Sequence, residues 1–132
     1  METNTGIRIE GLHQVAQRAT DVDRAAAFYC DMFGARLLGT FDPPGIAFVD
    51  MAGTRLLFEA SASSATLYFR VADLQGAYAT LTARGVTFEA PPQLVHRDDT
   101  GQFGPPGNEE WMAFLRDTEG NLVGLAERRA PA

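Results

Sequence analysis

Two ionisable side chains stand where expected strands end, at positions from which they could act on a small molecule. Glu59 closes the strand-like run Arg55 to Glu59, and a carboxylate in an apolar cavity is suited to removing a proton from carbon beside a carbonyl group. His96 follows the run Val86 to Val95, and an imidazole at a cavity mouth can shuttle a proton near neutral pH or contact an anion. These two residues are the candidate catalytic groups. The alternatives are a solvated strand end for Glu59 and a loop histidine beside acidic residues for His96.

Composition excludes several other chemistries. The chain has 132 residues, a formal net charge of −6, no lysine and a single cysteine, Cys30. One cysteine forms neither an intrachain disulfide nor a cysteine cluster for a metal, and the lack of lysine removes Schiff-base chemistry. The acidic balance argues against nucleic acid as a partner, and no apolar run is long enough to cross a bilayer. We therefore expect a cytoplasmic protein with neither a nucleic-acid nor a membrane partner.

The elements that must position these residues recur twice in the same order. Each copy has an extended run, a capped helix and three further strand-like runs separated by turn residues. The first helix is capped by Thr20-Asp21 and ends at Gly34, and the second is capped by Asp73 and ends at Gly85. The expected strands are Leu12–Ala19, Arg36–Phe41, Ile46–Met51 and Arg55–Glu59 in the first copy, and Thr66–Val71, Val86–Val95, Glu110–Arg116 and Leu122–Glu127 in the second.

This order predicts one α+β domain over residues 1–132, made of two βαβββ modules. The first module covers residues 11–60 and the second covers residues 66–127. Residues 128–132 are expected to be a frayed tail.

The sequence resembles the vicinal oxygen chelate superfamily, which includes glyoxalase, methylmalonyl-CoA epimerase, extradiol dioxygenase and the bleomycin- and fosfomycin-resistance proteins. The resemblance rests on GLHQVAQRATDVDRAAAFYCDMFGARLL near the start and EEWMAFLRDTEGNLVGLAE near the end. It implies that the two modules form a cupped mixed β-sheet around a cavity, with the helices on the outer face. It also implies a homodimer.

Members of this superfamily that bind a metal ion supply four ligands from inward-facing strand positions. The resemblance places these positions at Gln14, Leu57, Thr66 and Gly124, of which only Gln14 has a side chain that serves as a ligand in some glyoxalases. Glu59 lies two residues beyond Leu57, on the same strand face. We therefore expect no cofactor, and the alternative is a divalent metal ion (Zn, Ni, Mn or Fe) held by Gln14 and Glu59.

The period of two along a strand predicts which side chains line the cavity even without a metal ion. A few polar groups in a mostly apolar cup are typical of small-molecule pockets. Phe103, in the glycine- and proline-rich loop, and Trp111, on a late strand, either close over a ligand or form a dimer contact. The expected ligand-binding residues are Gln14, Leu57, Thr66, Tyr68, Phe103, Trp111, Leu122 and Gly124. His13 lies out of this register and is expected to be structural.

Three functions follow from these positions. The first is a metal-free binding domain, similar to the drug-sequestering resistance proteins, in which an aromatic molecule stacks on Tyr68, Trp111 or Phe103. The alternative is a lyase or isomerase, similar to lactoylglutathione lyase or an epimerase, in which Glu59 removes a proton beside a carbonyl group. The third is a dimeric accessory module without a ligand.

Overall fold

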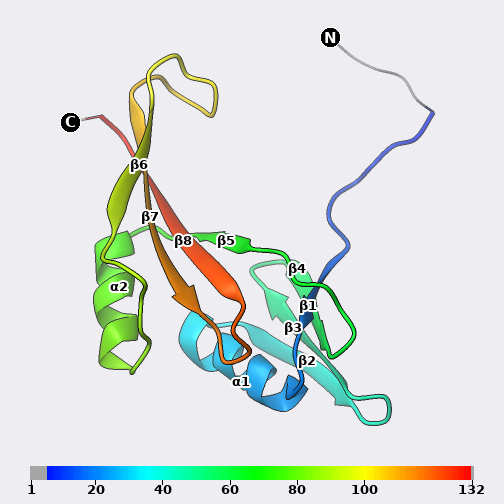
Figure 1. Ribbon diagram of the computed structural model, residues 1–132. Helices are drawn as coiled ribbons and strands as arrows, with labels where there is room; N and C mark the ends of the chain where they lie inside the picture. Colours follow the sequence, from blue (N-terminus) through cyan, green and yellow to red (C-terminus); the bar gives the residue numbers. More distant parts are fainter. Residues whose placement is uncertain (1–5, 132) are drawn as a thin grey trace.

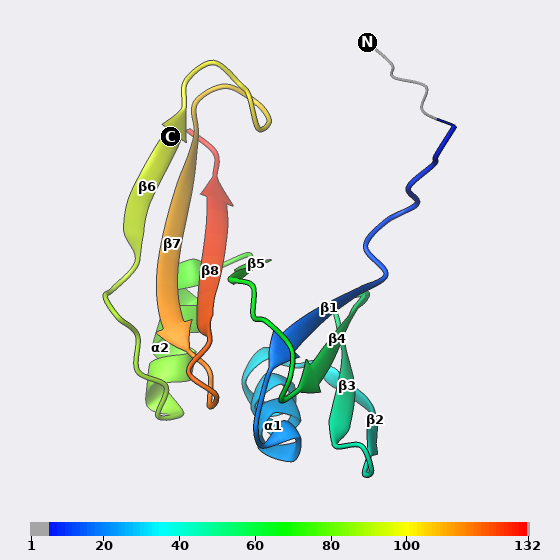
Figure 2. The same ribbon diagram turned by 45° about the vertical axis from the view of Figure 1, so that its right-hand side comes forward.

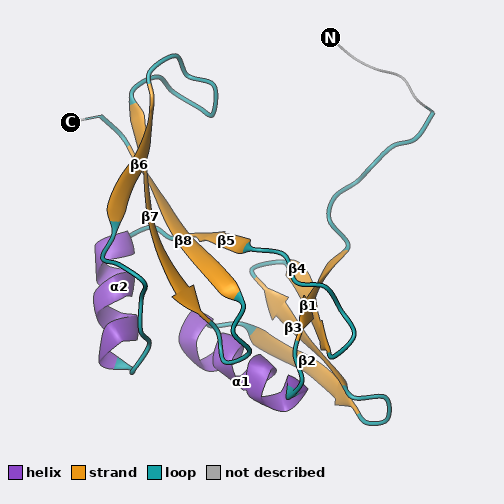
Figure 3. Ribbon diagram, viewed as in Figure 1, coloured by secondary structure: helices purple, strands orange, loops and turns teal. Residues whose placement is uncertain are grey.

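The computed structural model describes residues 6–131 and contains two helices and eight strands in that part of the chain (Figures 1 and 3). The first module comprises β1 (Gln14–Arg18), α1 (Val22–Phe33), β2 (Arg36–Phe41), β3 (Ile46–Met51) and β4 (Thr54–Glu59). The second comprises β5 (Leu67–Arg70), α2 (Leu74–Ala83), β6 (Gln93–Asp98), β7 (Asn108–Arg116) and β8 (Leu122–Arg129). The predicted α+β class and the repeated βαβββ order are confirmed.

Each module forms its own four-stranded mixed sheet. The strand orders are β1-β4-β3-β2 and β5-β8-β7-β6. In both sheets the first strand of the module lies parallel to the last, and the other pairs are antiparallel. Figure 2 shows the two sheets beside each other, with one helix packed against each. We call the side of a sheet that carries its helix the helix face, and the other side the open face.

Aspartate side chains start both helices as the sequence predicts. Asp21 Oδ1 accepts a hydrogen bond from the Arg24 amide of α1, and Asp73 Oδ1 accepts one from the Gly76 amide of α2, both at 3.0 Å. These bonds satisfy amides that have no partner within the helix. Gly34 ends α1 in the left-handed conformation (φ 74°), which a residue without Cβ adopts readily.

The strand expected over Val86–Val95 is displaced along the chain. β6 begins only at Gln93, and residue Phe88 makes a single bridge to Leu115. Pro91 and Pro92 explain the shift, because a proline has no amide hydrogen to give to a neighbouring strand. His96 therefore lies within a strand rather than after one.

The C-terminal strand is longer than expected. β8 continues to Arg129 and pairs with β7 through Glu109 and Glu110. The first two residues of the predicted frayed tail, Arg128 and Arg129, are therefore part of a sheet.

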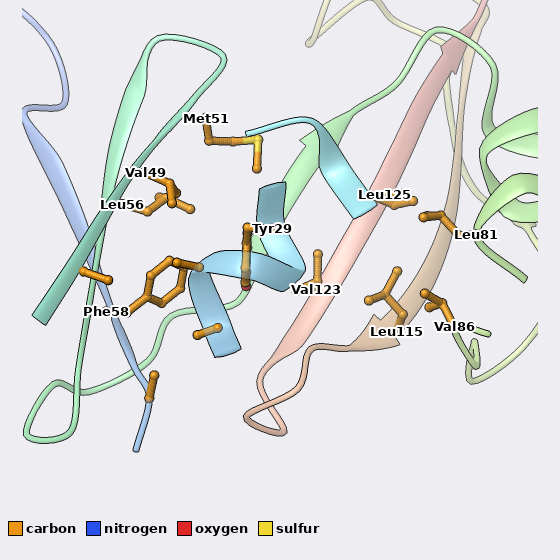
Figure 4. Close-up of a cluster of buried hydrophobic side chains, with 14 of the residues drawn as sticks. Tyr29, Val49, Met51, Leu56, Phe58, Leu81, Val86, Leu115, Val123 and Leu125 are labelled. Atoms are coloured by element: carbon orange, nitrogen blue, oxygen red, sulfur yellow. The ribbon is translucent and has the colours of Figure 1, made fainter. Parts of the chain in front are cut away.

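Helix α1 lies between the two modules and joins their hydrophobic cores. Tyr29 is fully buried, with Phe58 of β4 on one side and Val123 of β8 on the other (Figure 4). Its hydroxyl donates to Asp117 Oδ2 at 2.8 Å, in the turn between β7 and β8. Burial in the core, with the neighbouring Asp117 carboxylate adding to it, raises the pKa of the Tyr29 hydroxyl. The phenol therefore stays protonated and donates across the module boundary.

Within residues 6–131, neither helix has the length and apolarity that a membrane crossing requires.

Candidate functional site

Polar and aromatic side chains gather on the open face of the first sheet. Gln14 and Arg55 are register partners on the parallel strands β1 and β4. Both therefore point to the same side, away from the buried residues Leu56 and Phe58. The cavity they border measures about 290 Å³ and is lined by Gln14, Leu38, Gly39, Phe41, Phe48 and Arg55.

The Arg55 guanidinium is held in place by three neighbours. Its Nε donates to Gln14 Oε1 at 2.9 Å, and its Nη2 lies 2.9 Å from His13 Nε2. Arginine has no acceptor, so His13 accepts this bond through Nε2. The guanidinium carbon also lies 5.5 Å from the centre of the Phe48 ring, which is within cation–π range. His13, expected to be structural and out of register, thus belongs to this cluster.

Tyr68 covers Gly124 on the open face of the second sheet. The two residues are register partners on β5 and β8. A Cβ atom at position 124 would lie 2.8 Å from Tyr68 Cδ2 and 2.9 Å from Phe114 Cε1. The rings of Tyr68 and Phe114 meet edge to face with centroids 5.8 Å apart. Glycine at position 124 is therefore what lets two aromatic rings close over the strand.

A second open-face cavity lies at the far end of the same sheet. It measures about 470 Å³ and is lined by Val95, His96, Gln102, Phe103, Glu110, Met112 and Arg128. The rings of His96 and Phe103 lie edge to face with centroids 6.0 Å apart. Arg128 and Glu110 form an ion pair at 3.3 Å. Two of the predicted site residues, His96 and Phe103, thus meet at one cavity.

The loop that carries Phe103 is folded around Asp98. The Asp98 carboxylate accepts hydrogen bonds from the amides of Gly101, Gln102 and Phe103, at 3.1, 2.8 and 2.8 Å. These bonds hold the pKa of the Asp98 carboxyl below its usual range, and the bond from Phe103 contributes most. The Gly107 amide donates to the Asp98 carbonyl at 2.8 Å and closes the loop. One residue thereby fixes the loop of the second cavity.

The four positions that the resemblance assigns to metal ligands do not fit a metal ion. Gln14 Oε1 already accepts a hydrogen bond from the Arg55 cation, and the Leu57 side chain has no atom that can coordinate a metal ion. Thr66 is exposed and precedes β5, while the space beside Gly124 is filled by aromatic rings. Residues 6–131 contain no group of three His, Cys, Asp or Glu side chains able to hold an ion. Zinc sites normally have at least three protein ligands.

The two candidate catalytic residues belong to different sheets. Glu59 is the last residue of β4, where its carbonyl accepts from the Ala19 amide at 3.0 Å. His96 lies in β6, the outer strand of the second sheet. The structure therefore does not bring Glu59 and His96 together within one chain, and Glu59 lines neither open-face cavity. Leu122, another predicted contact, is half-buried at the start of β8, on the same side as Gly124.

Trp111, an expected ligand or dimer contact, lies on the helix face of β7, on the opposite side of the sheet from Tyr68. It lies two residues before the buried Ala113, on the same side of the strand, and packs against the hydrophobic core. Its Nε1 donates to Glu109 Oε1 at 2.9 Å, and the Arg129 guanidinium lies 4.2 Å from the ring centre. Trp111 therefore contributes to packing on the helix face of the second sheet.

A larger cavity, of about 760 Å³, lies between the modules next to both helices. Five of its thirteen lining residues are methionine or aromatic, and Arg70 is the charged residue among those that line it. The lining residues are Met32, Phe33, Met51, Ala52, Thr54, Tyr68, Phe69, Arg70, Val71, Ala77, Thr80, Leu81 and Leu125. This cavity offers apolar volume but no carboxylate or imidazole that could take part in a reaction.

Comparison with known proteins identifies the family. Residues 11–125 match the Glyoxalase/Bleomycin resistance protein/Dioxygenase superfamily. The chain belongs to this superfamily. A glyoxylase-like domain-containing protein of Didymella fabae is 34% identical over 122 residues, which cover 83% of this chain and 88% of that protein.

Solved structures of the superfamily share the fold. A lactoylglutathione lyase from Agrobacterium tumefaciens matches with a TM-score of 0.67 and 21% identity, over 90% of this chain and 94% of that one. A superfamily member from Sphaerobacter thermophilus matches with a TM-score of 0.68 and 24% identity, over 90% and 98%. At this identity the likeness concerns the fold alone. What the site does depends on this chain's own residues.

Arg55 is a residue of this site that no sequence motif singles out. The period of two that places Leu57 and Glu59 on one face of the strand also places Arg55 there. Its contact with Gln14 depends on the register between β1 and β4, which are far apart in the sequence. The face of Arg55 was therefore predictable, but its partner was not.

Proposed function

We propose that this glyoxalase-like chain binds a small, mainly apolar molecule on its open faces without the help of a metal ion. The observation that carries the proposal is Tyr68, whose ring rests over Gly124 and against Phe114 yet remains 57% exposed. A positioned aromatic ring with one free side can stack on a flat ligand.

The donor set supports binding without a metal ion. Leucine and glycine stand at two of the four ligand positions, and an arginine is bonded to the glutamine at a third. We expect protein purified without chelator to carry substoichiometric zinc, nickel, manganese and iron by elemental analysis. Added zinc should leave the melting temperature unchanged, because an ion that binds the folded state would raise it. A stoichiometric metal, or a clear rise with zinc, would contradict this part of the proposal.

Binding is favoured over a lyase or isomerase that uses Glu59 as a base. Glu59 lies outside both open-face cavities, and His96, the other candidate catalytic residue, lies in the other sheet. A general base must come within hydrogen-bond reach of the proton it removes. Glu59 borders none of the cavities described above, so none of them places a substrate within its reach.

We also propose that two copies associate through the open faces, so that the bound molecule is enclosed between them. Five of the ten exposed large apolar side chains of residues 6–131 lie on these faces or the adjoining loop, and such patches commonly mark interaction surfaces. The members are Leu38 and Phe41 on the first sheet and Tyr68, Val95 and Phe103 on the second sheet and its loop. Sedimentation velocity should give a mass of twice 14.3 kDa. A single species at the monomer mass would contradict the dimer but not the binding of a ligand.

The binding proposal is tested by titrating ¹⁵N-labelled protein with the neutral aromatic probe 2-naphthamide. We expect the amide signals of Tyr68 and Gly124 to shift. The indole signal of Trp111 should stay in place, because Trp111 is on the helix face. Tyr68 also lines the cavity between the modules, so Gly124 is the discriminating signal. Shifts at Met32, Phe69 and Leu81 without a shift at Gly124 would place the ligand in that cavity instead.

Two variants sharpen this test. Tyr68→Ala removes the exposed ring and should weaken probe binding by about tenfold, equivalent to the ~1.4 kcal/mol that stacking and burial contribute. Tyr78→Ala is the matched control, because Tyr78 lies on α2 and packs against Phe88, with ring centroids 4.8 Å apart. The control should bind the probe like the wild type. Equal binding by Tyr68→Ala and wild type would overturn the proposal.

A further inference from the structure

We propose that Arg55 recognises a carboxylate on an apolar, flat ligand, so that the open face of the first sheet selects small aromatic acids. This inference rests on the proposed function and names the class of ligand. Its basis is the Arg55 guanidinium, which lines the cavity and is hydrogen-bonded to the side chains of Gln14 and His13. The ring of Phe48 packs against the same group.

The hydrogen bonds of Arg55 leave one edge of the guanidinium available. Of its five N–H donors, one on Nε is bound by Gln14 and one on Nη2 is bound by His13. These two donors form the side edge of the group. Three donors remain, two on Nη1 and one on Nη2. One from each nitrogen forms the end edge, where two parallel N–H groups match the two oxygens of a carboxylate.

The charge of Arg55 has no acidic partner in direct contact. Within residues 6–131 the ion pairs involve Arg24, Arg97, Arg116, Arg128 and Arg129, and none of them includes Arg55. Asp50 is its register partner on β3, yet no ion pair forms between them. A half-buried cation held only by an amide, an imidazole and a ring retains its capacity to bind an anion.

The rest of the cavity suits a small ring. Phe48 lies beneath the guanidinium, and Phe41 meets Phe48 edge to face with centroids 5.9 Å apart. Gly39 has no side chain to fill the space, and Leu38 adds an apolar wall. The volume of about 290 Å³ is at the lower end for small-molecule pockets. We therefore choose a carboxylate over a phosphate ester, because this small cavity offers one guanidinium edge and no second cation.

Isothermal titration calorimetry with 2-naphthoate and 2-naphthamide tests this inference, because the two probes share a ring system and differ in charge. Wild-type protein should bind the acid about tenfold or more tightly than the amide, as expected for a charge-assisted bidentate pair. Arg55→Gln should lose this preference by weakening the acid alone. Arg36→Gln is the matched control, because Arg36 also pairs with Asp50 in register but does not line the cavity. The control should keep the preference.

The outcomes separate this inference from the proposed function. If wild-type protein binds both probes equally, or if folded Arg55→Gln still prefers the acid, the carboxylate site is refuted while ligand binding stands. If folded wild-type protein binds neither probe, the proposed function fails and the carboxylate site fails with it. Circular dichroism of each variant verifies that it is folded.

Discussion

The ring of Tyr68 occupies the place that a side chain at position 124 would need. Gly124 and Tyr68 are paired across β8 and β5, and a Cβ atom on Gly124 would approach Tyr68 Cδ2 to 2.8 Å. The resemblance to the superfamily places a metal ligand at position 124. In this chain the Tyr68 ring fills the space beside position 124. The open face therefore presents an aromatic surface where the resemblance implies a metal site.

Replacing Gly124 should therefore destabilise the protein through overpacking. We expect Gly124→Ala to lower the free energy of unfolding by about 1–3 kcal/mol, measured by urea denaturation. The cost should shrink when Tyr68→Ala is also present, leaving the contact with Phe114 Cε1 at 2.9 Å. Gly39→Ala is the control, because the nearest atoms to its Cβ lie at an ordinary 3.4 Å. The same cost with and without Tyr68→Ala would show that this ring does not close the position.

The fold was largely predictable because local signals and tertiary structure agree. Asp21 and Asp73 cap the helices, and the alternation of Ala47, Val49 and Met51 gives β3 one buried side. Where the prediction failed, non-local pairing decided the outcome. β8 extends past the expected end because Arg128 and Arg129 find partners on β7, which no local pattern reveals.

The candidate site was predictable only in part. The period of two predicts that Tyr68 and Gly124 both face a cavity, and in the structure they are neighbours on one face of the second sheet. Applied to Trp111, it would also have shown that this residue shares a side with the buried Ala113. The Arg55 cluster could not be predicted in full, because Gln14 and Arg55 meet only through a parallel register set by the folded sheet.

Glu119 should contribute to stability by joining the modules. Its Oε1 accepts from the Thr20 amide at 2.8 Å and its Oε2 pairs with Arg24, so the second module holds the start of α1. We expect Glu119→Gln to cost about 1–3 kcal/mol in urea denaturation, because bonds to a charged group are lost. Glu89→Gln, which breaks the exposed ion pair with Arg116, should cost less than about 1 kcal/mol. Equal losses would show that Glu119 acts as an ordinary surface residue.

The contribution of Glu119 should also depend on pH. Burial raises its pKa, but hydrogen bonds from Arg24, Asp21 and Thr20 outweigh this and leave the pKa below the ordinary value of 4.5. A lowered folded-state pKa means that the stabilisation is complete above the unfolded value and is lost as the pH falls through the folded value. The stability difference between wild type and Glu119→Gln should therefore be largest near neutral pH and shrink below 4.5. A difference that grows on acidification would contradict this assignment.

Asp98 should control the order of the loop that carries Phe103. Asp98→Asn removes the charge that three loop amides share, so hydrogen exchange at Gly101, Gln102 and Phe103 should become faster. Asp99→Asn removes an equal charge from the next residue, which is exposed, and should leave that exchange unchanged.

The wild-type loop should behave like Asp98→Asn in acid. Hydrogen bonds from the Phe103, Gln102 and Gly101 amides lower the pKa of Asp98, so the stabilisation is complete above its ordinary value of 3.8 and disappears as the pH falls through the lowered value. Exchange measured at a series of pH values, corrected for the intrinsic rate, should show protection in the wild type at neutral pH and its loss in acid. In Asp98→Asn the protection should be weak at every pH. Protection that persists in Asp98→Asn near neutral pH would mean that the glycines and prolines of residues 99–107 order the loop without Asp98.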